Sequence, residues 1–536
     1  MMKEKDMNNV DVTTSSFESL IKSGCVYVDK TDYLYSIVRK GIGYYFLSRP
    51  RRFGKSLTLS TLEAIFKGKK ELFKGLYIGG TNYDFKEYPV IHIDFLGLET
   101  RSCDMLERSL LTNLSWIASD YGVFIQEKKS LKETFQLLIK ELAEKFGSVV
   151  ILIDEYDKPL SDNINKLDEA LKIRDLLRTF FEVIKSSVPY IRFVFITGVT
   201  KYSKVSVFSA MNNLNDLSLN RNYATMLGYT QEELEHYFKE GIDEGLAGLG
   251  LTREDYLRKV KEWYDGYRFA PMAETVYNPV AIGFLFDQNG VVFNSFWSTT
   301  GGSKLLYDLA NGSNFNVETD IEKNFLVDKF SAHDIVDLAN GNITKDKYNS
   351  LLFQSGYLTI ADSKLDGRLL SFDFPNKDVS EFFTDVLLPL YVGEENKYKT
   401  GNLMALLADG DVESFVEEVK AMFASVPYDT RDRYEHSYEV GFYCMLRAIG
   451  ANVNAEVPTN KGRIDVSLEL GDHIYIFEFK VGKTAEEALS QIKQNGYAEK
   501  YNAPRYKGKT LHLVGVSFSE ANRSVDQILY ETHQLQ

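Results

Sequence analysis

The sequence predicts an α/β protein with a doubly wound parallel sheet in its N-terminal part, a mostly helical middle and a smaller α/β domain at its C-terminus. Short apolar runs alternate with helical periodicity over the first two hundred residues, which is typical of strands joined by crossover helices. Residues 464–480 instead show the period-two alternation of an antiparallel hairpin. Because 536 residues are too many for one core, several domains are expected.

Apolar runs define the strands expected in the N-terminal sheet. The run at 149–153 is apolar throughout, which favours a central strand buried on both faces. In such a sheet, ligands bind outside the carboxyl ends of the strands, so polar residues there are candidate site residues. The expected strands are Gly43–Leu47, Val90–Phe95, Val149–Ile153 and Ile191–Ile196.

The segment RPRRFGKS, residues 49–56, ends like a phosphate-binding loop. Gly54, Lys55 and Ser56 match the end of the pattern G-x-x-x-x-G-K-[ST], and helical periodicity follows them. The first turn of that helix would offer N–H groups and a partial positive charge to a phosphate. Lys55 is expected to reach the β and γ phosphates of ATP, and Ser56 to ligate Mg²⁺. Arg51 and Arg52 are expected to add positive charge near the phosphates.

The start of this loop departs from the pattern, because Arg49 stands in place of the first glycine and Pro50 has no N–H. Arginine adopts a positive φ only at a cost, so the early part of the loop is expected to have a different shape. No acidic residue lies between Asp32 and Glu63, a span that contains six basic residues. This basic island indicates a small bound polyanion such as a triphosphate; the alternative is a solvated basic face.

An acidic pair, Asp154 and Glu155, follows the apolar run at 149–153. Carboxylates at the end of a buried strand are costly unless something there uses them. Asp154 is predicted to hold Mg²⁺ and Glu155 to polarise the attacking water; the alternative is a helix N-cap. Thr197 ends the fourth strand, where it either senses the γ-phosphate or is an ordinary strand-end threonine.

Four segments resemble the bacterial AAA-ATPase-like family that usually carries a C-terminal PD-(D/E)XK nuclease-like domain. They are YVDKT (27–31), RPRRFGKSL, ILIDEYDKPL and the long string FITGVTKYSKVSVFSAMNNLNDLSL. The resemblance implies a P-loop NTPase sheet in an ATPase domain at 1–227, with arginine as the family's own residue at the first loop position. LGYTQEEL and WYDGYRF also match and would belong to a helical lid after the sheet.

Residues 228–430 are predicted to form this helical lid or middle region. The segment 345–385 differs, because a helix is followed there by two apolar runs joined by Asp366-Gly367, a strong hairpin signal. A winged-helix unit is one interpretation, and such units sometimes bind DNA. The few basic residues of the segment favour a lid or packing role instead.

The C-terminal domain is expected at 431–536, with a hairpin whose strands join at a two-residue Gly471-Asp472 turn. In that register Asp465 stands opposite Glu478, and Lys480 points to the same face. Opposed carboxylates destabilise a hairpin, whereas a divalent metal between them would be ligated by both. The alternative is a surface hairpin in which the lysine bridges two acids.

The spacing D-x12-E-x-K resembles the PD-(D/E)XK nuclease core, a restriction-endonuclease-like α/β fold. The resemblance implies that Asp465 and Glu478 bind Mg²⁺, with Mn²⁺ as an alternative, and that Lys480 orients the attacking water. It also implies roles for Glu439 on the preceding helix and Gln491 on the following helix.

Composition limits the partners. A net charge of −14 argues against coating nucleic acid through bulk charge, but residues 491–509 are locally basic and could contact a phosphate backbone. No apolar run could span a bilayer, and three widely spaced cysteines suit a reducing cytoplasm. The sequence thus predicts a cytoplasmic ATP-binding, ATP-hydrolysing protein coupled to a metal-dependent phosphodiesterase that acts on DNA or RNA. One alternative is a nucleotide-regulated switch or scaffold whose nuclease-like domain only binds a partner; another is a loop that binds no nucleotide.

Overall fold

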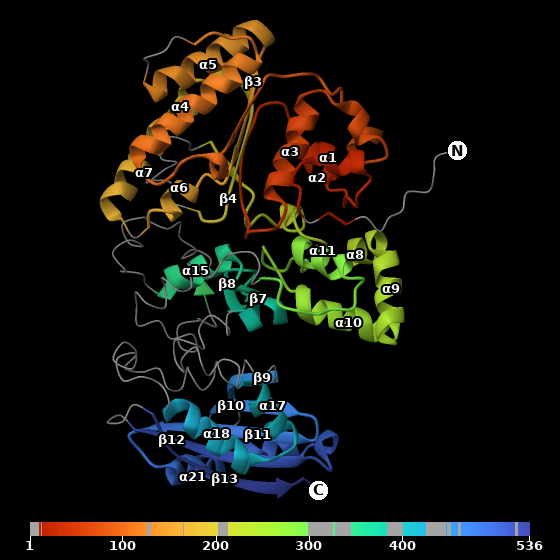
Figure 1. The fold of residues 1–536 in the computed structure, drawn as a ribbon, viewed down its shortest axis with the longest axis vertical. Coiled ribbons are helices and arrows are strands. Elements are labelled where there is room, and N and C mark those ends of the chain that lie inside the picture. Colours follow the sequence, from red (N-terminus) through yellow and green to blue (C-terminus); the bar gives the residue numbers. More distant parts are fainter. Residues whose placement is uncertain are drawn as a thin grey trace. The chain divides into compact units, whose positions relative to one another are not determined.

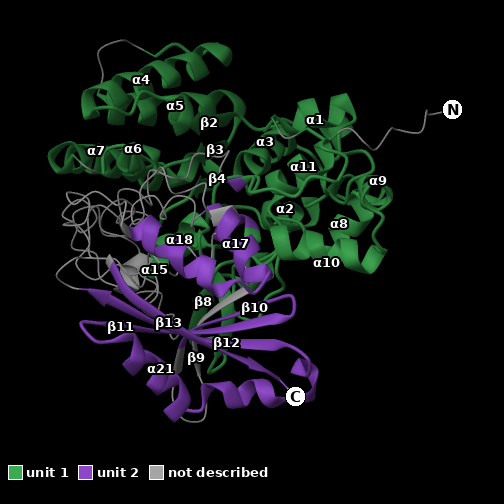
Figure 2. Cartoon of the chain, turned by 60° about the horizontal axis from the view of Figure 1, so that its bottom comes forward, with its two compact units in different colours: residues 1–296, 322–377 green, residues 297–321, 378–536 purple. Residues whose placement is uncertain are grey.

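The computed structural model divides the chain into two compact units, shown in Figure 2. One contains residues 1–296 and 322–377, and the other contains 297–321 and 378–536. The three-domain division expected from the sequence stays a prediction. The structure describes residues 10–11, 13–125, 130–164, 166–201, 213–297, 325–326, 345–382, 400–424, 446, 452–458, 463–519 and 524–535.

The first unit is built on a five-stranded sheet with the order β2-β3-β4-β1-β5. All neighbouring strands are parallel, and β1 and β3 are buried along their whole length. The four strands expected from apolar runs are present, and the predicted α/β fold is confirmed. The strands are β1 (Gly43–Ser48), β2 (Val90–Asp94), β3 (Val149–Asp154), β4 (Ile191–Gly198) and β5 (Asn215–Asp216).

Helices lie on both faces of this sheet (Figure 1). One face carries α1 (Phe17–Ser23), α2 (Thr31–Val38) and α3 (Lys55–Phe66), and the other carries α4 (Cys103–Asp120), α5 (Leu131–Phe146), α6 (Lys158–Ser161) and α7 (Leu167–Ser186). Side-chain caps begin α4 at Ser102 and α5 at Ser130. By contrast α3 begins after Gly54 with no side-chain cap, so its first N–H groups are available to a ligand.

The strand order reverses beside β1. The chain runs from β1 to the far edge strand β2, returns through β3 and β4, and then adds β5 on the other side of β1. Ligands of such sheets bind at the carboxyl ends of the strands next to this reversal. The topology therefore brings the loop after β1 and the ends of β3 and β4 to one edge.

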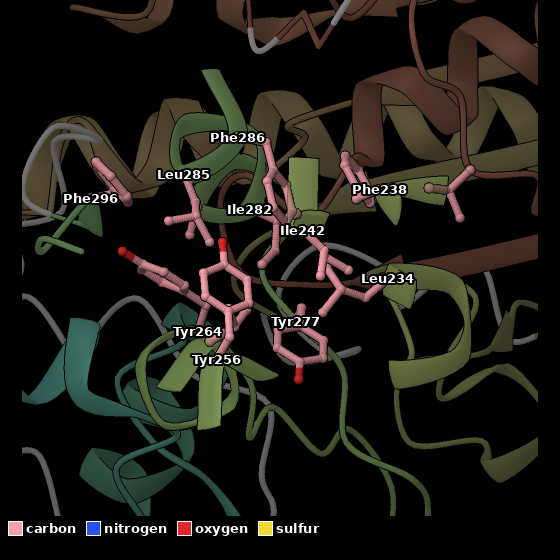
Figure 3. Packing of buried hydrophobic residues seen from close by; sticks show 13 residues of the cluster. Leu234, Phe238, Ile242, Tyr256, Tyr264, Tyr277, Ile282, Leu285, Phe286 and Phe296 are labelled. Carbon is pink, nitrogen blue, oxygen red and sulfur yellow. The ribbon is translucent and has the colours of Figure 1, made fainter. Parts of the chain in front are cut away.

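A helical region follows the sheet, as predicted, and has its own aromatic core. Figure 3 shows Tyr256, Tyr264 and Tyr277 packed with Ile282 and Phe286, all of them buried. Among the residues that the structure describes, no helix is both long and apolar enough to cross a membrane. The helices are α8 (Gln231–Tyr237), α9 (Lys239–Leu249), α10 (Arg253–Tyr264) and α11 (Pro279–Asp287).

The hairpin predicted around Asp366-Gly367 is also present. Helix α15 (Lys345–Ser355) is followed by β7 (Thr359–Lys364) and β8 (Leu369–Asp373), which pair antiparallel. The short strand β6 (Phe325–Leu326) pairs with the other side of β8. Both Asp366 and Gly367 have positive φ, at 55° and 83°, which explains the Asp-Gly signal.

The second unit contains a five-stranded mixed sheet with the order β13-β12-β11-β10-β9. Strands β11 and β12 are parallel, and the other pairs are antiparallel. The two-residue turn predicted at Gly471-Asp472 joins β10 to β11. The strands are β9 (Asn452–Pro458), β10 (Arg463–Leu470), β11 (His473–Val481), β12 (Thr510–Ser519) and β13 (Ser524–Gln534).

Helices cover both faces of this second sheet. Helix α21 (Ala485–Gln494) packs on β11 and β12 on one face. On the other face lie α17 (Thr400–Ala408) and α18 (Val412–Ala424), which the sequence boundaries had assigned to the middle region. The Tyr475 hydroxyl of β11 donates to the Leu407 carbonyl at 2.6 Å. Alternate residues of β11 therefore face two different helical layers.

Helix α21 packs closely against β12 at Gly515. A Cβ atom there would lie 2.5 Å from the Ala485 carbonyl oxygen and 2.9 Å from the Leu489 nitrogen. We expect Gly515→Ala to lower the free energy of unfolding by about 1–3 kcal/mol, because the helix backbone must move away. Urea unfolding of the full chain measures this, with Gly97→Ala as the control, since a Cβ at Gly97 meets open space. Equal stability of the two variants would contradict the close packing.

Candidate nucleotide and metal sites

The left-handed residues of the phosphate loop are Arg52 and Gly54, and not Arg49, which stands where the standard pattern has its first glycine. Gly54 has φ +86°, and Arg52 also lies in the left-handed region at φ +68°, whereas Arg49 does not. A left-handed arginine is uncommon and costly, so the loop is held in this shape by its surroundings. Arg51 and Arg52, the two predicted phosphate contacts, are both exposed.

Arg49 is buried and acts as a clamp. Its terminal nitrogens donate to the carbonyls of Ser48 (2.9 Å), Ser218 (2.7 Å) and Tyr223 (3.1 Å). Its guanidinium also lies 4.3 Å from the centroid of the Phe269 ring. Burial lowers the pKa of Arg49 to about 9. Arg49, which stands where the standard pattern has a glycine, thus links the end of β1 to the segment after β5 through hydrogen bonds.

Lys55 is held by the loop itself. Its ammonium donates to the carbonyls of Arg49 (3.1 Å) and Pro50 (3.0 Å) and lies 3.3 Å from Glu155 Oε1. Glu155 has φ +51°, so the residue directly after β3 is also left-handed. A phosphate at the loop would compete with these three oxygen partners for the ammonium.

The hydroxyls of Ser56 and Thr197 meet the carboxylate of Asp154. Ser56 Oγ donates to Asp154 Oδ2 at 2.5 Å, and Thr197 Oγ1 donates to Asp154 Oδ1. These residues come from α3, β3 and β4, and the side chain of Asp154 is buried. The structure therefore brings together three residues that the sequence placed at one site. A hydroxyl and a carboxylate are donors that suit Mg²⁺ when phosphate and water complete its shell.

Sequence reasoning did not single out Asp94, which lies next to this cluster. It ends β2 and pairs in register with Asp154 on β3. Burial raises the pKa of Asp94, and the charge of Asp154 adds to the effect. A carboxylate at the end of an apolar strand was the signal used for Asp154, and the same signal in VIHID could have identified Asp94.

Asp157 was missed as well, and no sequence signal distinguishes it. Its buried carboxylate accepts hydrogen bonds from the backbone nitrogens of Val199 (3.2 Å) and Thr200 (2.6 Å). Burial raises the pKa of Asp157, and the charge of Glu155 adds to the effect. Asp157 thus fixes the end of β4, the strand that carries Thr197 to Asp154.

In the second unit, the β10–β11 hairpin has the predicted register. Paired residues run from Leu470 with His473 to Val466 with Phe477. The next position in this register places Asp465 opposite Glu478.

Asp465, Glu478 and Lys480 lie together as predicted. Asp465 Oδ2 accepts from the Phe479 nitrogen at 2.8 Å, and Lys480 Nζ donates to Glu478 Oε1 at 3.0 Å. Glu478 pairs with Gly515 on β12, so it lies on the face covered by α21. The hairpin therefore gathers two carboxylates and an ammonium beside the first turns of that helix.

Glu478 has an unsatisfied oxygen. Its side chain is 1% exposed, and Oε2 has no hydrogen-bond partner among the residues that the structure describes. Burial raises the pKa of Glu478 to about 7; the charge of Asp465 adds to this, and Lys480 opposes it. A buried orphan oxygen next to a second carboxylate fits a divalent cation.

The two helix residues implied by the resemblance have different outcomes. Gln491 lies on α21, half-buried, three residues after the buried Ala488 and therefore on the side that faces the sheet. Glu439 lies outside the described residues. Within the described part of the chain, no three His, Cys, Asp or Glu side chains form a group that could hold a metal. A metal at either site would thus need phosphate or water ligands as well.

The basic segment at 491–509 is partly neutralised. Lys493 pairs with Glu531 at 2.6 Å, and Lys509 donates to the Gly471 carbonyl at 2.8 Å. Lys500, Arg505 and Lys507 are exposed. The Lys509 contact places this segment at the turn end of β11, about five residues or 17 Å from Glu478. A nucleic acid that touched both would need to extend along the sheet.

Comparison with known proteins supports the same two-part organisation. Residues 11–208 match the family described as a predicted AAA-ATPase, and residues 433–528 match the PD-(D/E)XK nuclease superfamily. A protein of Azotobacter chroococcum mcd 1, named "Uncharacterized protein in vnfD 5'region", is 35% identical over 518 residues, covering 94% of this chain and 95% of that protein.

These matches define a P-loop ATPase-like protein with a nuclease-like C-terminal fold. The chain belongs to the AAA-ATPase-like family and also carries a PD-(D/E)XK nuclease-like domain near its C-terminus. The solved structure of the Aeropyrum pernix ORC1 protein in complex with DNA is also similar, at 11% identity over 72% of this chain and 96% of that one. Its TM-score of 0.24 is too low to establish a shared fold over the whole chain.

Proposed function

We propose that the first unit binds Mg·ATP and hydrolyses it. The observation that carries this proposal is the meeting of Ser56 and Thr197 at Asp154, beside Lys55 and the uncapped start of α3. Bound Mg²⁺ would neutralise charge on the phosphates, with Ser56 and Asp154 as its protein ligands.

Glu155 would act on the attacking water in this site. Its carboxylate is now paired with Lys55, so it is not free to polarise water. A bound triphosphate draws the ammonium of Lys55 toward its β and γ oxygens and releases Glu155. Nucleotide binding thus both occupies the lysine and frees the base. Glu155→Gln should bind Mg·ATP normally and hydrolyse it at least about 100-fold more slowly; equal hydrolysis by the variant would contradict this role.

We propose that the second unit is a metal-dependent phosphodiesterase that acts on DNA or RNA. The orphan Oε2 of Glu478 beside Asp465 carries this proposal. A divalent metal would lower the pKa of a bound water and neutralise developing charge. Asp465 and Glu478 would be the metal ligands, and Lys480 would hold the attacking water. The exposed basic side chains of Lys500, Arg505 and Lys507 would contact the phosphate backbone of the nucleic acid.

Labelled single-stranded and double-stranded DNA and RNA test this activity. Cleavage is expected with Mn²⁺ or Mg²⁺, none with EDTA, and none with Asp465→Asn. If the wild-type chain cleaves no nucleic acid under any of these conditions, the phosphodiesterase proposal is wrong. A nucleotide-regulated unit that only binds a partner would then be the function to test.

Metal binding at Glu478 is expected to weaken in acid. Because the pKa of Glu478 is raised to about 7, a metal must displace its proton below that pH. We expect the apparent Mn²⁺ affinity to fall about tenfold per pH unit between pH 7 and pH 5.5. Calorimetric titration measures this, and Glu478→Gln should remove the dependence. An affinity that does not change with pH in the wild type would contradict a protonated, metal-binding Glu478.

The raised pKa of Glu478 also affects the stability of the metal-free chain, but in the opposite direction: lower pH weakens metal binding and favours folding. A carboxyl whose pKa is higher in the folded state favours folding most at low pH. The contribution of Glu478 is complete below its unfolded pKa of 4.5 and is lost as the pH rises through about 7. Metal therefore stabilises the unit most where protonation stabilises it least.

A further inference from the structure

The ring of Phe53 connects the phosphate loop to the helical region that follows the sheet. Phe53 lies between Arg52 and Gly54, the two left-handed residues of the loop, and is only 1% exposed. Its ring centroid lies 4.8 Å from that of Tyr267 and 5.1 Å from that of Phe269, at interplanar angles of 74° and 86°. Both contacts are edge-to-face, a favourable geometry for aromatic pairs. Tyr267 and Phe269, from the WYDGYRF segment, thus form an aromatic socket that anchors the loop.

The backbone of the helical region holds this aromatic socket in place. Tyr267 and Val276 exchange two backbone hydrogen bonds, of 3.3 and 2.9 Å. The next residue, Tyr277, exchanges two with Tyr229, of 2.7 and 3.2 Å, and its side chain belongs to the buried core shown in Figure 3. The socket is therefore part of the helical region, and the position of the loop depends on how that region packs.

The β7–β8 hairpin is attached to the same segment. The hydroxyl of Thr359 donates to the Gly266 carbonyl at 2.9 Å and accepts from the Arg268 nitrogen at 2.7 Å. The guanidinium of Arg268 donates to the Ala361 carbonyl at 2.8 Å. Gly266 has φ +102°, and a Cβ atom there would lie 1.8 Å from the Pro375 carbonyl oxygen, so the two backbones are in close contact. This short segment therefore contacts the loop, the helical region and the hairpin directly.

A nucleotide at the loop would act on the residues next to Phe53. Gly54 is the N-cap of α3, and Lys55 is the first residue of that helix. A loop that is anchored at Phe53 keeps its shape before the nucleotide arrives, whereas a loop without the anchor would adopt this shape in only a fraction of the molecules. The apparent affinity for a ligand falls in proportion to that fraction. Because coupling between two sites is reciprocal, bound nucleotide would in turn stabilise the contacts of Phe53.

We propose that Tyr267 and Phe269 are positioning residues of the nucleotide site, which act through Phe53 and couple nucleotide binding to the packing of the helical region and the β7–β8 hairpin. This inference rests on the proposed binding of Mg·ATP and adds the regulation of the same site. Neither ring of the socket needs to touch the nucleotide, because the coupling passes through packed side chains and backbone hydrogen bonds.

Calorimetry on the full chain with Mg²⁺ and a non-hydrolysable ATP analogue tests the positioning role. We expect Tyr267→Leu and Phe53→Leu to bind the analogue about threefold to tenfold more weakly, the change that corresponds to the loss of an aromatic pair. Tyr267→Phe keeps the ring and should bind as the wild type does. The matched control is Phe286→Leu, which removes a stacked pair with Phe238 (centroids 5.2 Å apart) in the core shown in Figure 3, to which Phe53 does not belong. This control should also bind the analogue normally.

Hydrogen exchange of backbone amides measures the coupling in the other direction. The amides of Tyr267 and Val276 form the bridge that holds the socket. With the analogue bound to the wild type, both should exchange more slowly, because local opening of the bridge becomes rarer. In Phe53→Leu, at an analogue concentration that saturates this variant, their exchange should not change.

The outcomes separate this inference from the proposed ATPase. Wild-type affinity in both Tyr267→Leu and Phe53→Leu would overturn the positioning role. An equal loss of affinity in Phe286→Leu would overturn it as well, because any loss of aromatic packing in the helical region would then weaken binding. Slower exchange in saturated Phe53→Leu would show that the coupling does not pass through this ring. A wild-type chain that binds no analogue would overturn the proposed nucleotide site and this inference together, whereas the other outcomes leave the nucleotide site intact.

Discussion

Lys480→Ala is expected to reduce metal-dependent cleavage of nucleic acid by about 10²–10⁴-fold and to leave ATP binding unchanged. Lys480 donates to Glu478 Oε1, and its side chain is 20% exposed, so it can also reach a water at the site. Alanine removes the group that would orient this water. Initial cleavage rates of labelled DNA and RNA at saturating Mn²⁺ measure the effect.

A second measurement separates catalysis from structure at this residue. Lys480 opposes the upward pKa shift of Glu478, so its loss should move the half-point of Mn²⁺ binding to higher pH. Lys483→Ala is the matched control, because Lys483 is an exposed lysine just after β11. Its cleavage rate and its pH half-point should both equal those of the wild type. A Lys480→Ala enzyme that cleaves at the wild-type rate would reduce Lys480 to a counter-ion of Glu478.

Local patterns in the sequence were enough to predict the strands and the hairpin register. An uninterrupted apolar run defines β3, because a strand that is buried on both faces shows no alternation of apolar and polar residues. Alternation with a two-residue turn defines β10 and β11, because a slip of one residue would turn every side chain to the wrong face. The alternation and the length of the turn are therefore sufficient to place Asp465 opposite Glu478.

Residues whose partners are distant in the sequence could not be predicted in this way. Arg49 was expected to distort the phosphate loop, and its role as a clamp depends on the Ser218 and Tyr223 carbonyls, about 170 residues away. Asp157 likewise depends on Val199 and Thr200. The hydrogen bonds of Arg49 and Asp157 cannot be predicted from hydrophobic periodicity or from a sequence motif. They form only when the parallel strands bring their carboxyl ends together.

The loop shape follows from the same tertiary contacts. Because Arg49 is fixed by carbonyls and by the Phe269 ring, the left-handed turn falls at Arg52. The carbonyls of Arg49 and Pro50 then face Lys55. The conformation of the loop around Arg49 and Pro50 therefore sets the resting position of the lysine that would bind phosphate.

Lys55→Met is expected to weaken Mg·ATP binding by about 10–100-fold or more, since one charged hydrogen bond to phosphate is worth about 1.5–3 kcal/mol. Methionine keeps most of the buried volume, so the loss reports the ammonium rather than a cavity. Calorimetry with Mg·ATP, or with a non-hydrolysable analogue, measures the affinity without requiring hydrolysis.

Lys67→Met is the control, placed just after the end of the same helix. Lys67 follows the last residue of α3 and pairs with Glu63 at 2.5 Å, far along the helix from the loop. It should bind Mg·ATP as the wild type does. Unchanged affinity in Lys55→Met would mean that the ammonium never leaves the carbonyls of Arg49 and Pro50, and that the loop holds Lys55 for structure alone. A loss confined to Lys55→Met would instead show that phosphate outcompetes three protein oxygens, among them one from Glu155, whose release makes hydrolysis possible.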